Sequence, residues 1–482
     1  MVDLVLARPP SCDAAERHWS DTAPLGLAYL LAAARAEGLA VAAVDGRLDR
    51  HDSLEQTAAA ILSTAPRVVG ISALTVEFRR ANALAGRLRS APAPPLLVLG
   101  GPHANAVPLQ AIAEGTSFDV VVAGEGESVL PRIVRAVLEG RPIPQEPGIY
   151  RRDEQGVERG EGRAALDCGL AELPLPAWDL FRRLDTYPII SERGCPYSCV
   201  FCSRNLGQRV RYRPLDQVMA ELEWLHATFA PRAIYFEDET FGLVASRTHD
   251  LLARMERFNR DKGIFFKAQT RVDHVTAERA QRLRRAGFGY LELGVESGDE
   301  GVLQQARKGT QVAQVLGCVR HLKAAGIKVW ANLVIGLPGE TRQSVRNSMR
   351  LAVRINPDRL SVAIITAYPG TQVYAWALAG EKGYRLLSAN WDDYDKYLSA
   401  SVELEGLPYA TMRRLQIQIY LETYARNWRL RELAAMVWQH RAFFSALSGR
   451  LVRQLLPWRA AGGRARVGGR VPGPPAARAA LP

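Results

Sequence analysis

The stretch Arg193-Gly-Cys-Pro-Tyr-Ser-Cys-Val-Phe-Cys202 decides how this chain of 482 residues is interpreted. It places Cys195, Cys199 and Cys202 at a C-x3-C-x2-C spacing, directly after an apolar run that predicts a strand at 187–191. Thiolates are preferred ligands of iron–sulfur clusters, and a four-iron cluster normally takes four of them. No other cysteine lies within 25 residues, so a cluster bound here would leave one iron open to an exogenous ligand.

Two other roles for these cysteines are weaker. A structural zinc site takes four protein ligands, commonly from two C-x2-C or H-x3-H pairs, and the chain has no second pair. A disulfide framework does not suit an odd set in a chain with only six cysteines. The spacing therefore favours an iron–sulfur cluster with an open iron, where a small molecule can bind and be reduced.

The cysteine spacing, with Phe201 just before the last cysteine, closely resembles the radical S-adenosylmethionine (SAM) superfamily. In that family the open iron chelates the methionine part of SAM, and reductive cleavage gives a 5′-deoxyadenosyl radical that abstracts hydrogen. The resemblance implies a 4Fe-4S cluster on Cys195, Cys199 and Cys202, SAM as a second cofactor, and an electron donor such as flavodoxin or ferredoxin.

Residues 1–140 alternate apolar, strand-like runs with helix-like segments. We expect strands at 4–7, 40–44, 68–71, 96–100 and 120–123, and helices at 25–37, 53–63, 79–90, 109–114 and 128–138. Continuous apolar runs are typical of strands buried on both faces. This order predicts an α/β domain with a parallel, flavodoxin-like (Rossmann-type) sheet, whose ligands bind beyond the carboxyl ends of the strands.

Small residues follow these strands where such a ligand would bind. Ahead of the cysteine motif, the turns resemble the cobalamin-binding domain of cobalamin-dependent radical SAM enzymes. The resemblance implies cobalamin contacts from six residues of these turns: Ser72, Gly100, Gly101, His103, Gly124 and Glu125. The D-x-H-x-x-G motif that carries an axial histidine is absent, which fits a subclass that binds cobalamin without one. A domain that has lost cobalamin would show the same pattern, so that alternative stays open.

Residues 141–186 read as a proline-containing linker, in which Trp178 and Phe181 are expected to pin the chain to the next domain. The alternation then resumes over 187–372. Strands are expected at 187–191, 233–236, 264–268, 290–295, 329–335 and 359–365, with helices at 215–228, 246–261, 277–286, 312–325 and 342–355. Six βα units match the partial (β/α)6 TIM barrel typical of radical SAM cores, whose chemistry lies at the carboxyl ends of the strands.

These strand ends carry the residues that the radical SAM resemblance assigns to SAM. They are Glu237, Asp238 and Glu239 for the methionine amino group, Arg271 for its carboxylate, Glu296 and Ser297 for the ribose, and Ile335 and Tyr368 for adenine. Each also has a simpler interpretation, as part of a solvated loop, a surface ion pair or a plain turn. Their occurrence in family order at successive strand ends favours the SAM site.

The C-terminal part shows no such alternation. Residues 373–458 are expected to be helical and to cap the barrel, and residues 459–482, rich in Gly, Pro, Ala and Arg, to be disordered. Within the first segment, 440–459 combines aromatic and aliphatic residues with arginines, as either an ordinary packed helix or a basic helix in peripheral contact with a membrane. Cys318, on a helical pattern, is expected in the core rather than on the cluster.

Composition limits the compartment and the partners. The net charge is +12, but residues 451–482 hold six arginines and no acid, so half of the excess lies in this tail and nucleic-acid binding is disfavoured. No run approaches the length of a membrane span. The free cysteines and an oxygen-sensitive cluster favour a reducing, cytoplasmic location.

The combined resemblance implies an enzyme that methylates an unactivated carbon of a small-molecule or lipid-like substrate, through a 5′-deoxyadenosyl radical and methylcobalamin. Three alternatives remain. The same cofactors can serve radical cyclisation or rearrangement, and a domain without cobalamin would leave a SAM-only dehydratase or epimerase. A non-catalytic iron–sulfur carrier is the third, although a carrier needs no open iron.

Overall fold

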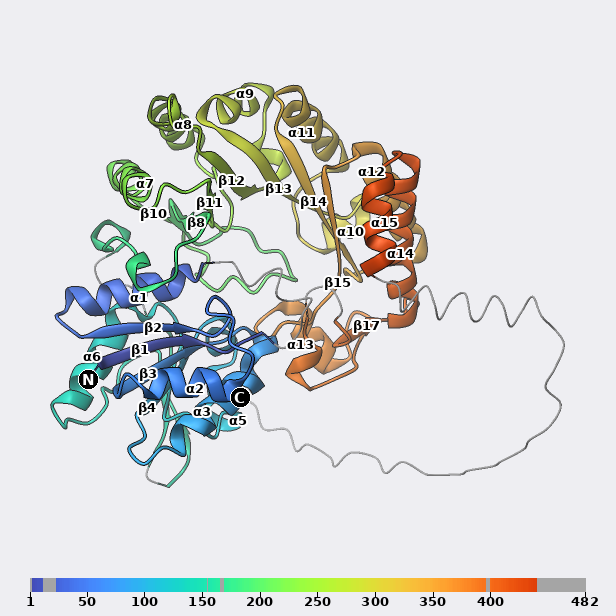
Figure 1. Ribbon diagram of the computed structural model, residues 1–482. Helices are drawn as coiled ribbons and strands as arrows, with labels where there is room; N and C mark the ends of the chain where they lie inside the picture. Colours follow the sequence, from blue (N-terminus) through green and yellow to red (C-terminus); the bar gives the residue numbers. More distant parts are fainter. Residues whose placement is uncertain (1, 12–22, 154, 165–168, 396–398, 440–482) are drawn as a thin grey trace, which may run out of the picture. The chain divides into compact units, whose positions relative to one another are not determined.

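The first alternating region folds as one twisted sheet with helices on both faces (Figure 1). The computed structural model describes residues 2–11, 23–153, 155–164, 169–395 and 399–439. Seven strands form this sheet: β1 (Val2–Arg8), β2 (Val41–Asp45), β3 (Pro66–Ser72), β4 (Leu96–Gly100), β5 (Val120–Val122), β6 (Ile149–Arg152) and β7 (Glu158–Arg159). Their order is β2-β1-β3-β4-β5-β6-β7, and the first five are parallel, which confirms the predicted flavodoxin-like order.

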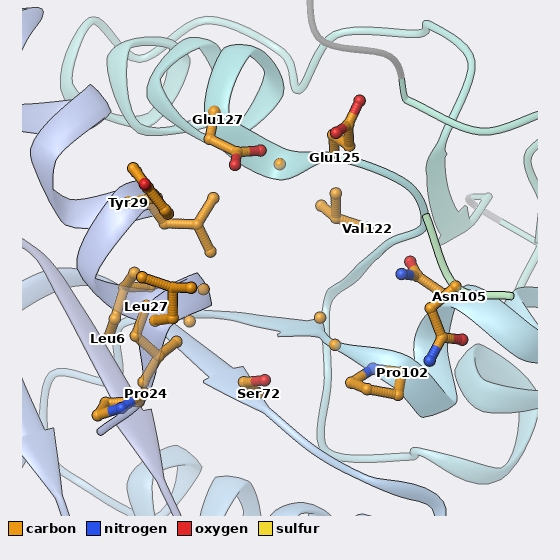
Figure 2. Close-up of a pocket in the computed structure, with 18 of the residues that line it drawn as sticks. Leu6, Pro24, Leu27, Tyr29, Ser72, Pro102, Asn105, Val122, Glu125 and Glu127 are labelled. Carbon is orange, nitrogen blue, oxygen red and sulfur yellow. The ribbon is translucent and has the colours of Figure 1, made fainter. Parts of the chain in front are cut away.

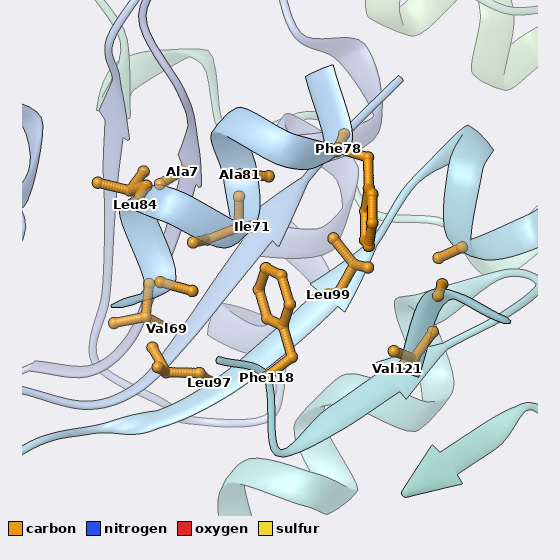
Figure 3. Packing of buried hydrophobic residues seen from close by; sticks show 14 of the residues in the cluster. Ala7, Val69, Ile71, Phe78, Ala81, Leu84, Leu97, Leu99, Phe118 and Val121 are labelled. Carbon is orange, nitrogen blue, oxygen red and sulfur yellow. The ribbon is translucent and has the colours of Figure 1, made fainter. Parts of the chain in front are cut away.

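Alternation of side chains along β1 creates two hydrophobic layers, one on each face of this sheet. Leu4 and Leu6 face one layer with α1 (Leu25–Ala36) and α6 (Gly126–Leu138). Val5 and Ala7 face the other layer, where four helices pack: α2 (Leu54–Leu62), α3 (Phe78–Arg89), α4 (Pro102–Ala106) and α5 (Pro108–Glu114). Figure 3 shows part of this second layer, with the ring of Phe78 beside Leu99. Because both faces of the sheet are buried, the strands are held in place. The turns with small residues that follow them therefore lie together at the carboxyl edge of the sheet.

Part of the predicted linker belongs to this sheet. β6 pairs antiparallel with β5, and β7 pairs antiparallel with β6. Ala164 and Ala177 then join the hydrophobic layer of α1 and α6. Trp178 is fully buried and meets the ring of Tyr187 at 5.6 Å between centroids, so the linker is pinned at the start of the next sheet, as expected.

The second region forms an open six-stranded parallel sheet, as a partial barrel predicts. Its order is β15-β14-β13-β12-β11-β8. The strands are β8 (Thr186–Ile189), β11 (Ala233–Phe236), β12 (Phe265–Thr270), β13 (Phe288–Glu296), β14 (Lys328–Ile335) and β15 (Arg359–Ile364). The helices are α7 (Leu215–Phe229), α8 (Ala245–Asn259), α9 (Ala277–Ala286), α10 (Glu300–Gln305), α11 (Val312–Ala324) and α12 (Arg342–Ile355).

Local signals explain the ends of these helices. Thr276 and Thr341 cap the amino ends of α9 and α12 by accepting hydrogen bonds from backbone amides in the first turn. Gly287 and Asn356 end the same two helices in the left-handed conformation, which these residue types tolerate best. α9 and α12 therefore begin and end at the residues that the sequence pattern predicts.

The chain after β15 adds a small hairpin to the expected helices. It contains α13 (Gln372–Ala379), β16 (Tyr384–Leu386), β17 (Val402–Leu404) and α14 (Tyr409–Arg426). α14 is bound to β15 because Gln416 Nε2 donates to the carbonyl of Val362 at 2.6 Å, and the Tyr420 hydroxyl accepts from the Val362 amide at 2.8 Å.

A separate unit begins at Arg429 and contains α15 (Leu430–Gln439). The predicted basic helix at 440–459 and the tail at 459–482 lie outside the described residues. Among the helices that the structure describes, none combines the length and the apolar character needed to cross a bilayer.

Candidate active site

The three cysteines lie in a loop held at both ends by a short two-stranded sheet. β9 (Glu192–Arg193) pairs antiparallel with β10 (Arg211–Tyr212), which brings the two ends of loop 194–210 together. The Cys195 amide donates to the carbonyl of Gly207 at 3.1 Å. Gly194 has a φ of +96°, and a Cβ there would collide with the Arg209 backbone. The loop is thus ordered by its backbone, with the thiols left free.

The thiol set suits a cluster better than a single ion. In the described part of the chain, no three His, Cys, Asp or Glu side chains converge closely enough to hold one metal ion. The thiolates of a four-iron cluster bind different irons, so they lie further apart than the ligands of a lone ion. Burial raises the pKa of the Cys199 thiol, so the thiol keeps its proton until a metal displaces it. The donor set fits a 4Fe-4S cluster with three protein ligands.

Asp238 and Glu239, two of the three predicted acids after β11, support this loop. Asp238 is buried, and its carboxylate accepts hydrogen bonds from the amide and hydroxyl of Ser191, both at 2.6 Å. Glu239 accepts from backbone amides of Gly194 and Leu206 in the cysteine loop. Its Oε2 atom is buried with no hydrogen-bond partner, and burial raises its pKa. An orphaned carboxylate oxygen beside the cysteines fits the ammonium group of a bound amino acid.

Arg271 is engaged by other protein groups. Its guanidinium forms a two-pronged ion pair with Asp273, at 3.0 and 2.9 Å, and donates to the carbonyl of Lys308 at 2.8 Å. It also lies over the ring of Tyr197, in the cysteine motif, with 3.6 Å between Cζ and the ring centroid. These contacts use three of the five N–H groups of the guanidinium and hold Arg271 against the cysteine loop, and its bond to a SAM carboxylate stays a prediction.

Glu296 has a partner that the sequence did not reveal. Its carboxylate binds the Nζ atom of the buried Lys308 at 2.7 Å. Glu296 adopts a φ of +64°, at a register shift in the pairing of β13 with β14. Such a conformation is costly for a residue other than glycine, and here it coincides with the end of regular strand pairing. Ser297 is fully buried and lies 3.2 Å from the Ser348 hydroxyl, which places it in the packing below this strand end.

The two residues predicted to contact adenine, Ile335 and Tyr368, also make contacts within the protein. The carbonyl of Ile335 accepts a hydrogen bond from the Ile365 amide at 2.7 Å. Tyr368 packs against the hydrophobic layer of the N-terminal domain that contains Phe78. The structure therefore gathers the cysteines, Glu239 and Glu296 at one end of the core sheet, and it gives Asp238, Ser297, Ile335 and Tyr368 contacts within the protein.

A second site lies at the carboxyl edge of the N-terminal sheet. It is a largely apolar cavity of about 480 Å³ (Figure 2). Five of the six residues predicted to contact cobalamin line it: Ser72, Gly100, Gly101, Gly124 and Glu125. Figure 2 shows Ser72 and Pro102 on one side of the cavity and Glu125 and Glu127 across from them. The prediction that these turns form one site agrees with the geometry.

Glycines give this cavity its shape. A Cβ added to Gly26 or Gly100 would meet no atom within 4 Å, so each glycine leaves open space where a side chain would project. Gly101 instead has a φ of +91°, and a Cβ there would lie 2.6 Å from the Ser72 hydroxyl. Larger side chains at these positions would fill the cavity. Glycine keeps it open, which lets a large planar ligand lie against the backbone.

His103 does not reach this cavity. It is fully buried between Phe78 and Trp391, with ring centroids at 4.3 and 5.1 Å. Burial lowers its pKa to about 4, so the ring is neutral at physiological pH. Its Nδ1 atom lies 3.4 Å from the Thr75 hydroxyl. The sequence predicted that His103 contacts cobalamin because this residue follows a strand end. In the structure His103 belongs to α4, and its ring lies in the hydrophobic core.

Arg193 connects the two sites. It immediately precedes the Gly194-Cys195 pair, and its guanidinium binds Glu125 at 2.8 Å and Glu127 at 2.7 Å, all three side chains being buried. Arg211, on the paired strand, binds the same Glu125 carboxylate at 2.9 Å. The turn after β5 is thereby joined to the cysteine loop. Sequence reasoning missed Arg193 and Glu127 because an ion pair between distant segments leaves no local pattern.

Comparison with known proteins gives a match for each of the two domains that carry these sites. Residues 189–352 match the family model of the radical SAM superfamily, and residues 17–134 match that of the B12 binding domain. An uncharacterized methyltransferase of Pyrococcus horikoshii is 30% identical over 466 residues, covering 95% of this chain and 98% of the relative. The chain belongs to the radical SAM superfamily, in the group that carries a B12-binding domain.

Two further relatives show how this radical SAM protein compares with others. It is 25% identical over 374 residues to the anaerobic magnesium-protoporphyrin IX monomethyl ester cyclase of Rubrivivax gelatinosus, covering 73% of this chain and 65% of that enzyme. A solved structure of the radical SAM methyltransferase TsrM from Kitasatospora setae, with cobalamin and a 4Fe-4S cluster bound, aligns with a TM-score of 0.69. That alignment covers 88% of this chain and 89% of TsrM at 18% identity, which shows a common fold.

Proposed function

We propose that this radical SAM enzyme is a cobalamin-dependent methyltransferase acting on an unactivated carbon of a small-molecule or lipid-like substrate. The observation that carries the proposal is the Arg193 bridge. It fixes the glycine-lined cavity beside the cysteine loop through ion pairs to Glu125 and Glu127. Transfer of a methyl group between two cofactors needs both sites held in one arrangement, and buried ion pairs supply that.

Each part of the chain has a role in this proposal. Cys195, Cys199 and Cys202 hold the cluster, and the glycine-lined cavity holds cobalamin. When bound, the cluster cleaves SAM to a radical that takes hydrogen from the substrate, and cobalamin carries the methyl group. Glu239 supplies its unpartnered Oε2 to the SAM ammonium, and Glu296, oriented by Lys308, faces the ribose hydroxyls.

The products of SAM distinguish methyl transfer from the other reactions. A methyltransferase of this kind uses one SAM as methyl donor and another as radical source, so we expect S-adenosylhomocysteine and 5′-deoxyadenosine to form together. The measurement is liquid chromatography of reactions containing both cofactors, SAM and a reductant. The matched control omits cobalamin and should lose S-adenosylhomocysteine while retaining some 5′-deoxyadenosine. Formation of 5′-deoxyadenosine alone in the complete reaction would refute methyl transfer.

Radical cyclisation is the second candidate, favoured by the similarity to the anaerobic cyclase of Rubrivivax gelatinosus. A cyclase keeps both cofactor sites but needs no methyl donor. It would therefore give 5′-deoxyadenosine without S-adenosylhomocysteine even when cobalamin is bound. The same chromatogram thus separates the two candidates.

The cluster needs an external electron, and we expect the donor to approach from the side of Cys202. Cys202 is exposed, whereas Cys199 is buried. A reduced flavodoxin or ferredoxin approaching the Cys202 side would come closest to the cluster. A reducing compartment such as the cytoplasm would keep both the cluster and its donor reduced.

The C-terminal unit suits peripheral contact with a membrane. Leu430 and Trp438 of α15 are 60% and 72% exposed, and the sequence from 429 onward holds ten arginines and one acid. We expect the full-length protein to co-sediment with vesicles of phosphatidylglycerol and phosphatidylcholine at low salt, because basic and aromatic residues favour an anionic surface. The double variant L430S/W438S should bind several-fold less. Equal sedimentation of both proteins, or none, would overturn this contact.

A further inference from the structure

Glu237 differs from the two acids that follow it. It comes directly after β11, where its amide donates to the carbonyl of Ile189 at 2.8 Å. Because side chains alternate at a strand end, Asp238 points toward Ser191 while Glu237 points the other way. Glu237 lines the glycine-lined cavity, although it belongs to the radical SAM core. The three acids are adjacent in sequence and serve two different sites.

The other charged groups of the cavity are already paired. Arg8 binds Asp45 through two nitrogens, at 2.9 and 2.6 Å. Glu125 and Glu127 both bind Arg193. The Glu237 carboxyl has no hydrogen-bond or ion-pair partner among the described residues. Burial raises its pKa to about 7, with Arg8 opposing that rise and Asp238 adding to it. The half-buried Glu237 side chain lines the cavity, so its carboxyl is available to a ligand bound there.

The residues that line the cavity come from both domains, and Glu237 belongs to the set contributed by the core. Gly100, Gly101 and Gly124 come from the turns of the N-terminal sheet. Ile190, Arg193 and Glu237 come from the core. A planar ligand lying against the glycine turns presents its other face to the core. For a corrin, that face carries the axial position of a cationic cobalt, which attracts a carboxylate.

We propose that Glu237 accepts a hydrogen bond from a water molecule bound at the axial position of cobalamin that faces the radical SAM core. The inference rests on the proposed binding of cobalamin in this cavity and goes beyond it, because it assigns one residue to one face of the corrin. In this position Glu237 is a positioning residue that stabilises the cationic aquo form of the cofactor and orients the bound water.

The test uses aquocobalamin as the probe, because its bound water loses a proton with a visible colour change. A carboxylate beside that water stabilises the cationic aquo form. Wild-type protein loaded with aquocobalamin should therefore deprotonate about one pH unit higher than the E237Q variant. The E237D variant should fall between them. The matched control is E292Q, since Glu292 is a buried acid of β13 bound by Asn332 Nδ2 at 2.7 Å and lies outside the cavity lining.

Each result decides the matter. A lower midpoint in E237Q alone supports the inference. Equal midpoints in wild type, E237Q and E292Q overturn it, and equal midpoints with weaker retention of cobalamin by E237Q would assign Glu237 to the corrin periphery instead. Failure of the wild-type protein to retain cobalamin would overturn the proposed function itself, which the cobalt content of the loaded protein shows before any titration.

Discussion

Replacing Cys195, Cys199 or Cys202 by alanine should lower the iron content of the anaerobically reconstituted protein from about four atoms per chain to less than about one. The cluster has only three protein ligands in the motif, so the loss of one leaves two irons open and the cluster unstable. Formation of 5′-deoxyadenosine from SAM should become undetectable. Iron analysis and chromatography of the SAM products measure the two effects separately.

The control for this experiment is C318A. Cys318 lies in α11 and is 1% exposed, in the core position that its helical pattern predicts. Removing its thiol should change stability slightly and leave the iron content unchanged. Retention of about four irons by any of the three motif variants would contradict the assignment of that cysteine to the cluster.

Substituting Gly100 by leucine should abolish most cobalamin binding while leaving the cluster in place. A Cβ at Gly100 meets open space in the cavity, so the larger side chain occupies the volume of the ligand without disturbing the protein core. A clash of this kind costs roughly 1–3 kcal/mol, and we expect cobalamin affinity to fall about tenfold or more. Cobalt content after gel filtration measures the loss, and iron content should stay at the wild-type value.

G317L provides the matched comparison. Gly317 lies in α11, where a Cβ also meets nothing within 4 Å, but this helix is outside the cavity. The variant should retain cobalamin as the wild type does. If G100L bound cobalamin equally well, the glycine-lined cavity would not be the cobalamin site.

Much of the fold follows from local sequence signals. β4, β11, α9 and α12 begin and end at the residues where apolar runs, capping threonines and turn residues predict them. β6 and β7 were not expected, because they are short, charged strands: β6 forms by pairing with β5, and β7 by pairing with β6. The hairpin of β16 and β17 was missed for the same reason. Strands at the edge of a sheet depend on their partner more than on their own composition.

The sequence predicted the site residues from their position after strand ends. It did not predict the direction of each side chain, and that direction decides which site a residue serves. Glu237 and Glu239 were grouped together, yet one lines the cobalamin cavity and the other holds the cysteine loop. Arg271 has the residue type for binding a carboxylate, but Asp273 two residues later supplies one. Lys308 and Arg193 carry charges that matter only once distant segments meet. The Arg193 pairs form where the two sheets meet, and the Lys308–Glu296 pair forms within the core; neither leaves a periodic signal.

The central claim is that one chain holds an iron–sulfur cluster and cobalamin at adjacent sites. The most direct test is the iron and cobalt content of the wild-type protein, reconstituted anaerobically with cobalamin and passed through gel filtration. We predict about four irons and one cobalt per chain. Four irons without cobalt would contradict the claim, because the B12-binding domain would then be a scaffold without its cofactor.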